Sequence, residues 1–92
     1  MKEFNRAAIE RVRRMEAALD AVQKALHQRG EAARGEAGIR ENLRLLEAYM
    51  DSGCWLADYE LDESGGLPPD LKRGVLAQDT LYNLLYTPQT EE

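Results

Sequence analysis

The strongest constraint on this chain is a single narrow apolar stripe in its N-terminal third. Large apolar side chains recur there at alternating intervals of three and four residues, and they are Val12, Met15, Leu19, Val22 and Leu26. This spacing places them on one face of a helix. Neither proline nor glycine interrupts residues 3–29, but a helix with so thin an apolar face is marginally stable by itself in water. We therefore expect a long amphipathic helix over residues 1–29 that packs against another helix, either in the same chain or in a second copy.

Apolar residues and charges are unevenly divided along the chain. Eight of the 28 large apolar residues (Val, Ile, Leu, Met, Phe, Trp, Tyr and Cys) lie in residues 1–38, and twenty lie in residues 39–92. Residues 1–46 carry a net charge of +3 and residues 47–92 a net charge of −8, which together give the formal net charge of −5. We therefore expect residues 39–87 to hold most of the core. The basic first helix is expected to face the acidic half of its own chain or of a second copy.

Glycine and proline divide the rest of the chain into short segments, and apolar periodicity predicts a second helix that lies antiparallel to the first. The predicted segments, in chain order, are a glycine-punctuated loop over 30–38 with room for one turn of helix, a helix that begins at about 36 or 39 and ends at 50, a short helix over 54–59, one helical turn over 69–73 that ends at Gly74, a helix over 77–87 and a tail over 88–92. Together they predict a single all-α domain. An antiparallel helical hairpin is covered by a short helix, a Pro/Gly-rich turn and a C-terminal helix.

Composition excludes several classes of protein. With 12 Lys and Arg against 17 Asp and Glu, the chain lacks the clustered positive charge of a general nucleic-acid binder, so we expect no nucleic-acid partner. No apolar run approaches the roughly 18–20 residues that span a bilayer, and the charged N-terminus does not resemble a secretory signal. The single cysteine, Cys54, cannot form an internal disulfide and suits a reducing compartment. We expect a cytoplasmic protein with no membrane partner.

The sequence contains no recognisable catalytic motif. Cys54 and His27 are the only cysteine and histidine, and His27 falls on the flank of the apolar stripe, where we expect it to be exposed. The pair Gly65-Gly66 is not followed by the lysine that a phosphate-binding loop needs. We therefore expect no catalytic residue, no metal ligand and no cofactor.

One stretch of the second half carries a recognisable motif. It reads Trp55-x-x-Asp58-Tyr59-Glu60-x-Asp62-Glu63-x-Gly65-x-Leu67-Pro68-x-x-Leu71-Lys72-Arg73-Gly74-Val75-Leu76. This motif resembles that of a family of small bacterial proteins catalogued only as a domain of unknown function. The resemblance implies no activity, cofactor or functional residue.

The acidic run from Asp58 to Glu63 is the most suggestive candidate for a site. Its carboxylates could dock a basic partner, or they could cap neighbouring turns and pair with Lys72 and Arg73. We expect Asp58 and Arg73 to interact within the fold.

A cation site is a further interpretation of the same run. The spacing of Asp58, Glu60 and Asp62 matches the start of a calcium loop, whose ligands are carboxylate oxygens. The later positions of that loop do not match, because Glu63 replaces its glycine and Pro69 replaces its closing glutamate.

Five of the six aromatic residues lie in the second half of the chain. Tryptophan and tyrosine dominate many binding surfaces, but a small domain whose first half is poor in apolar residues also needs them for its core. We expect Trp55 to be buried.

We hypothesise a non-enzymatic protein–protein interaction module of the cytoplasm that uses the acidic and aromatic segment. Its candidate binding residues are Trp55, Asp58, Tyr59, Glu60, Asp62, Glu63, Lys72 and Arg73. The partner is an unidentified protein or a second copy, which would pair through the stripe of the N-terminal helix. Two alternatives stay open, a small structural homo-oligomer with no separate site and a divalent-cation-binding or hydrolytic protein.

Overall fold

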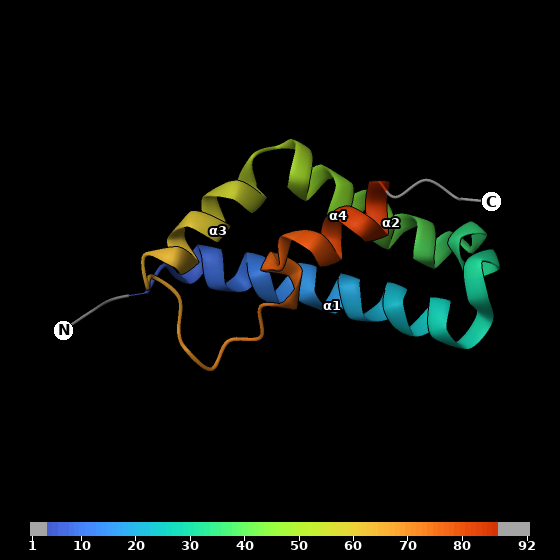
Figure 1. Cartoon of the computed structure of the whole chain (residues 1–92), viewed down its shortest axis with the longest axis horizontal. Coiled ribbons are helices and arrows are strands. Elements are labelled where there is room, and N and C mark those ends of the chain that lie inside the picture. Colours follow the sequence, from blue (N-terminus) through green and yellow to red (C-terminus); the bar gives the residue numbers. More distant parts are fainter. Residues whose placement is uncertain (1–3, 87–92) are drawn as a thin grey trace.

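The longest element, α1, runs from Arg6 to Arg29 along most of the length of the molecule (Figure 1). The computed structural model describes residues 4–86. Asn5 caps the start of α1, because its side-chain oxygen accepts a hydrogen bond of 3.0 Å from the backbone N–H of Ala8. The helix ends at Gly30, whose φ of 73° lies in the left-handed region that favours glycine.

The apolar stripe of α1 is buried within the chain itself. Its members are at most 5% exposed, apart from Leu26, which is partly buried. A 3₁₀ turn, η1 (Gly30–Gly35), reverses the chain, and α2 (Ala37–Asp51) runs back over α1 (Figure 1). Of the two arrangements that the stripe allows, the structure has the intramolecular one. A second copy would therefore have to bind at another surface.

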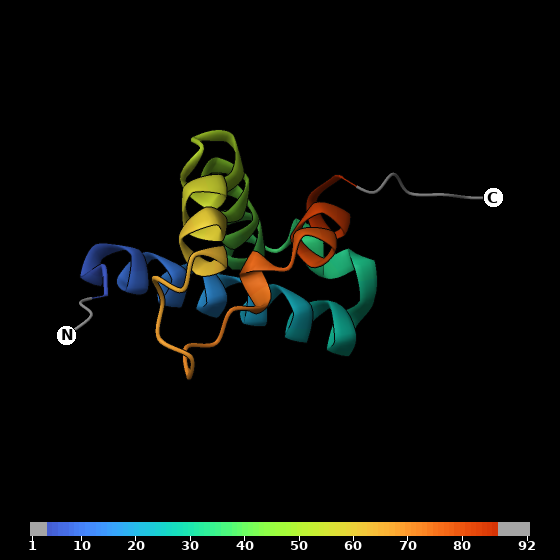
Figure 2. The ribbon, with the colours of Figure 1, turned by 60° about the vertical axis from the view of Figure 1, so that its left-hand side comes forward.

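The remaining elements complete an all-α fold. Helix α2 and the next helix, α3 (Cys54–Glu63), form an arch over α1, which Figure 2 shows from the side. A second 3₁₀ turn, η2 (Gly74–Leu76), contacts both α1 and α3, and α4 (Gln78–Tyr86) packs beside α2. Residues 4–86 contain no strand. The predicted fold class is confirmed.

Several predicted boundaries are wrong by a few residues. The helical turn allowed for in 30–38 is the 3₁₀ turn η1, and α2 begins at Ala37, close to the earlier of its two predicted starts, so that Gly38 lies inside it. Helix α3 continues to Glu63, so the whole acidic run is helical. Helix α4 begins at Gln78, whereas its predicted end at Thr87 and the predicted tail lie outside the described residues.

The helical turn predicted over 69–73 is absent. The chain makes only a tight turn there, in which the Leu71 N–H donates to the Pro68 carbonyl oxygen at 3.2 Å, and Gly74 begins η2 instead of ending a helix. Leu71 and Val75 are both buried in the core. Packing of these side chains, which local propensity does not register, therefore sets the path of this segment.

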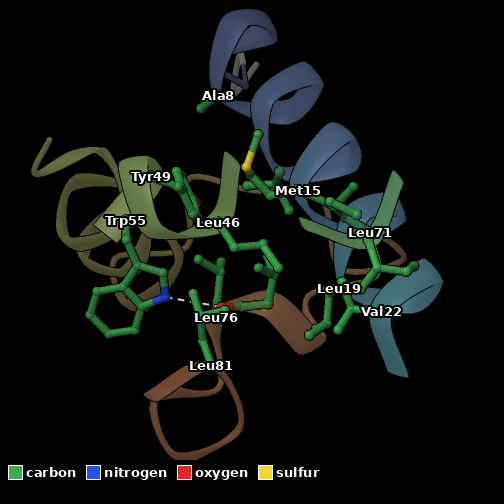
Figure 3. Packing of buried hydrophobic residues seen from close by; sticks show 14 of the residues in the cluster. Ala8, Met15, Leu19, Val22, Leu46, Tyr49, Trp55, Leu71, Leu76 and Leu81 are labelled. Atoms are coloured by element: carbon green, nitrogen blue, oxygen red, sulfur yellow. Dashed lines mark hydrogen bonds between the residues drawn. The ribbon is translucent and has the colours of Figure 1, made fainter. Parts of the chain in front are cut away.

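The core draws on every helix. Leu19 of α1, Leu46 of α2 and Leu81 of α4 are each at most 2% exposed and meet in one cluster (Figure 3). Trp55 joins this cluster from α3 with 7% of its surface exposed, which confirms the prediction that it is buried. Its ring nitrogen Nε1 donates to the Val75 carbonyl oxygen at 2.9 Å (Figure 3).

The glycine between α2 and α3 provides a test of the arch. Gly53 has a φ of 88°, a conformation that costs an L-residue roughly 1–2 kcal/mol. We expect Gly53→Ala to lower the free energy of unfolding by about 1 kcal/mol. Gly38, by contrast, lies in α2 with open space around it and no positive φ. Gly38→Ala should raise the free energy of unfolding by about 0.5 kcal/mol.

Urea titrations of both variants measure these changes. If Gly53→Ala and Gly38→Ala changed the free energy of unfolding by the same amount and in the same direction, the positive φ of Gly53 would not be what requires glycine there.

Candidate functional site

Helix α3 divides the predicted site into an inner and an outer face. The inner face carries Trp55, Asp58 and Asp62, spaced three and four residues apart. The outer face carries Leu56, Glu60 and Glu63, which follow one another at the same helical spacing. The inner residues bind other parts of the chain, whereas Leu56 is 52% exposed and both outer glutamates are exposed.

Asp58 is the most buried charged residue of the inner face, with 1% of its surface exposed. Its two carboxylate oxygens accept hydrogen bonds from Arg11, at 2.8 Å from Nε and 2.6 Å from Nη2. The Tyr49 hydroxyl donates a third bond of 2.7 Å to Asp58 Oδ2. Such a paired, bidentate arrangement is the form in which a carboxylate tolerates burial. Asp58, Arg11 and Tyr49 come from α3, α1 and α2, so we call this group the three-helix cluster.

The electrostatics of the three-helix cluster follow from this geometry. Burial raises the pKa of Tyr49 above its ordinary value, and the hydrogen bond to the Asp58 carboxylate raises it further. The hydrogen bond to Asp58 also raises the pKa of Arg11. Tyr49 is therefore a neutral donor and Arg11 a permanent cation at neutral pH.

A second group of polar contacts holds η2 against the rest of the fold. The backbone N–H of Val75 donates to Glu16 Oε1 at 2.8 Å, and the Val75 carbonyl accepts from Trp55. Glu16 is 8% exposed. A Cβ atom on Gly74 would lie 3.0 Å from Glu16 Oε2, so glycine at this position leaves room for the carboxylate. Val75 is thus held by α1 on one side and by α3 on the other.

Arg73 fixes the loop that joins α3 to η2. Its guanidinium donates to Asp62 Oδ1, to the Pro68 carbonyl oxygen and, at 3.1 Å, to the Leu71 carbonyl oxygen. The expected pairing of Asp58 with Arg73 is therefore wrong. Asp58 faces α1 and is saturated by Arg11, whereas Asp62, one helical turn later, lies next to the loop.

The remaining predicted residues are less tightly held. Lys72 pairs with Asp20 at 3.3 Å, but the two side chains are 74% and 53% exposed. An exposed pair of this kind contributes little to stability. Tyr59 is half-buried and stacks on Trp55, with ring centroids 5.1 Å apart and an interplanar angle of 14°.

The sequence analysis did not identify three residues that bind the inner face of α3 or hold η2. They are Arg11, Glu16 and Tyr49. The sequence does contain a signal for Arg11. A second, otherwise apolar stripe runs along the same helix at intervals of three and four residues, and Arg11 occupies one of its positions. The other members are Ala8, Met15, Ala18 and Val22. A charged residue within such a stripe faces the core and needs a buried counter-charge. The opposing carboxylate, forty-seven positions away, could not be identified from spacing alone.

The geometry does not reproduce a calcium loop. Asp58, Glu60 and Asp62 lie on a helix, with the first and third engaged by arginines and Glu60 on the outer face. Across the part of the chain that the structure describes, no three His, Cys, Asp or Glu side chains come together in a group that could hold a metal ion. His27 is exposed in the last turn of α1, as expected, and Cys54 is half-buried at the start of α3.

The fold and the inner face of α3 define a small all-α protein in which three helices meet at one buried carboxylate, that of Asp58. The chain belongs to the family described as Domain of unknown function (DUF4298), whose model matches residues 12–90. The predicted family resemblance is thereby confirmed. No curated protein and no solved structure matched the chain. Within residues 4–86, no helix has both the length and the apolar character needed to cross a membrane.

The raised pKa of Tyr49 predicts a pH-dependent contribution to stability. Because this pKa is higher in the folded than in the unfolded chain, the contribution is complete below about pH 10, the ordinary pKa of tyrosine, and is lost as the pH rises further. We expect Tyr49→Phe to lower the free energy of unfolding by about 1–2 kcal/mol at pH 7. The difference from wild type should shrink above about pH 10.

Urea unfolding of both proteins between about pH 7 and 11 measures this difference. Tyr59→Phe is a matched control, because no hydrogen bond from the Tyr59 hydroxyl is present among the described residues. A Tyr49→Phe difference that stays constant over the whole range would contradict the assignment.

Proposed function

We propose that this chain is a non-enzymatic interaction module of the bacterial cytoplasm, which binds a protein partner through the outer face of α3. The observation that carries the proposal is the exposure of Leu56, at 52%, on the same helical face as Glu60 and Glu63. An apolar side chain bordered by charged ones has the composition of a small docking surface, with an apolar centre and a polar rim.

The inner face of α3 supports this role by holding the helix rigidly. Asp58 is bound to α1 and α2, Asp62 is bound to Arg73, and Trp55 is bound to η2. A surface that is already ordered loses little conformational entropy when it binds. Of the predicted binding residues on α3, Glu60, Glu63 and the half-buried Tyr59 are thus available for contact, and the inner residues position them.

The charge of the outer face specifies the chemistry of the partner. Residues 47–92 carry a net charge of −8, and both exposed outer residues besides Leu56 are glutamates. The complementary partner is a basic segment with an apolar side chain that contacts Leu56. Electrostatic attraction of this type accelerates association and weakens with salt.

A non-catalytic role is supported by the saturation of the buried polar groups. Every buried side-chain nitrogen and oxygen of the described residues has a hydrogen-bond partner. The three-helix cluster is fully engaged within the fold, so its carboxylate and hydroxyl are committed to structure.

A paired-variant capture experiment tests the proposal. Tagged wild type, Leu56→Ser/Glu60→Gln and the control Phe4→Ser/Glu10→Gln are incubated with bacterial lysate, and bound proteins are identified by mass spectrometry. The control removes one exposed apolar and one exposed acidic side chain from α1 and its N-terminus. We expect a basic protein to bind wild type and control, and its purified form to bind the α3 variant at least about tenfold more weakly.

Equal binding of that protein to both variants would contradict the proposal. A concentration-dependent dimer that the α3 variant abolishes would favour the homo-oligomer instead. A rise in melting temperature with millimolar divalent cation would favour the cation-binding alternative.

A further inference from the structure

A second surface, of opposite charge, lies where η1 reverses the chain. A shallow groove of about 290 Å³ runs there between η1, α2 and α4. Its lining residues are Arg34, Arg40, Leu43, Arg44, Glu47 and Leu85. Three of these six residues are arginines, in a protein whose formal net charge is −5. We call this surface the arginine groove.

The arginines of the groove are held in different ways. Arg34 is held twice, because its Nη1 donates to the Leu84 carbonyl oxygen of α4 at 3.1 Å and its Nε pairs with Glu31 Oε1 at 2.5 Å. Arg44 pairs with Glu41 at 2.7 Å, but both side chains are more than 60% exposed. Arg40 is exposed, and its guanidinium forms no hydrogen bond or ion pair with any residue from 4 to 86. The groove therefore presents one unengaged guanidinium, that of Arg40, beside two that are each already paired with a glutamate.

The groove also has an apolar part. Leu43 of α2 and Leu85 of α4 are partly buried and pack against the core, and both contribute to the lining. Arg40, Arg44 and Glu47 follow one another along the same face of α2. A ligand that fits must combine negative charge near the arginines with an apolar group near the leucines.

We propose that the arginine groove binds an acidic peptide segment of a protein partner, with its carboxylates on Arg40 and Arg44 and an apolar side chain against Leu43 and Leu85. Guanidinium groups bind carboxylates with two parallel hydrogen bonds, which gives them directional specificity. The volume of about 290 Å³ lies just below the roughly 300–1,000 Å³ of small-molecule sites, so it suits side chains of a peptide better than a whole cofactor. Glu47 and the negative net charge oppose a densely charged polyanion.

This inference is independent of the proposed function, because it concerns another surface and a partner of opposite charge. If both surfaces act, the protein joins a basic segment at α3 to an acidic one at the arginine groove. Each surface can be disabled without touching the residues of the other.

Binding of a short fluorescent peptide in which glutamate and leucine alternate tests the proposal. Its affinity for wild type, Arg40→Gln, Arg40→Gln/Arg44→Gln and the control Arg14→Gln is measured by fluorescence anisotropy. Arg14 is exposed on α1 and does not line the groove. We expect Arg40→Gln to weaken binding by about tenfold and the double variant to weaken it further, with Arg14→Gln unchanged.

Two further probes separate the acidic peptide from simpler ligands. A peptide with glutamine in place of glutamate should bind at least about tenfold more weakly, and inorganic phosphate should not displace the acidic peptide at equal concentration. NMR shifts on peptide binding should concentrate at the methyl groups of Leu43 and Leu85. Any of four results would overturn the proposal. Arg40→Gln and Arg14→Gln could lose the same affinity for the acidic peptide, or the glutamine peptide could bind as tightly as the acidic one. Phosphate could displace the acidic peptide, or the acidic peptide could fail to bind.

Discussion

The fold depends on one buried carboxylate, that of Asp58, which pairs with the partly exposed guanidinium of Arg11 and with the hydroxyl of Tyr49. Asp58 is 1% exposed, and removal of a carboxylate from water costs several kcal/mol unless other groups replace the lost hydration. Two guanidinium N–H groups and one hydroxyl replace it here. The donors belong to α1 and α2, whereas the carboxylate belongs to α3. The Asp58 carboxylate therefore keeps all three hydrogen bonds only when the three helices lie in this arrangement. The cluster therefore determines how the arch of α2 and α3 sits on α1.

The same principle extends to the C-terminal part of the chain. Val75 is bound through its N–H to Glu16 of α1 and through its carbonyl to Trp55 of α3, which anchors η2 and with it the start of α4. Arg73 holds the preceding loop to Asp62 at the end of α3. Asp58, Asp62 and Arg73 are thus internal ties, although as a sequence they are part of a conspicuous charged segment. The outer face of α3 and the arginine groove, which we propose as binding surfaces, are not occupied by these ties.

The sequence predicted the helices well and the tertiary contacts poorly, for a physical reason. Helix α1 and its buried stripe follow from the local spacing of Val12, Met15, Leu19 and Val22, and Gly30 marks its end. Burial of Trp55 follows from its type and the scarcity of other core residues. The pairing of Asp58 with Arg11 depends on two residues that the chain brings together only after it folds, so the sequence led us to the wrong partner, Arg73. The predicted helical turn over 69–73 was wrong for the same reason, because burial of Leu71 and Val75 in the core sets the course of this segment.

The most direct test of the central claim is a double-mutant cycle on Arg11 and Asp58. The free energy of unfolding is measured by urea titration for wild type, Arg11→Gln, Asp58→Asn and the double variant, which isolates the coupling between the two side chains. A cycle on the exposed pair Glu41 and Arg44 is the control, with an expected coupling of about 0.3 kcal/mol. We predict a coupling of about 2 kcal/mol or more for Arg11 and Asp58. A coupling no larger than that of the exposed pair would contradict the claim that this pair determines the arrangement of the helices.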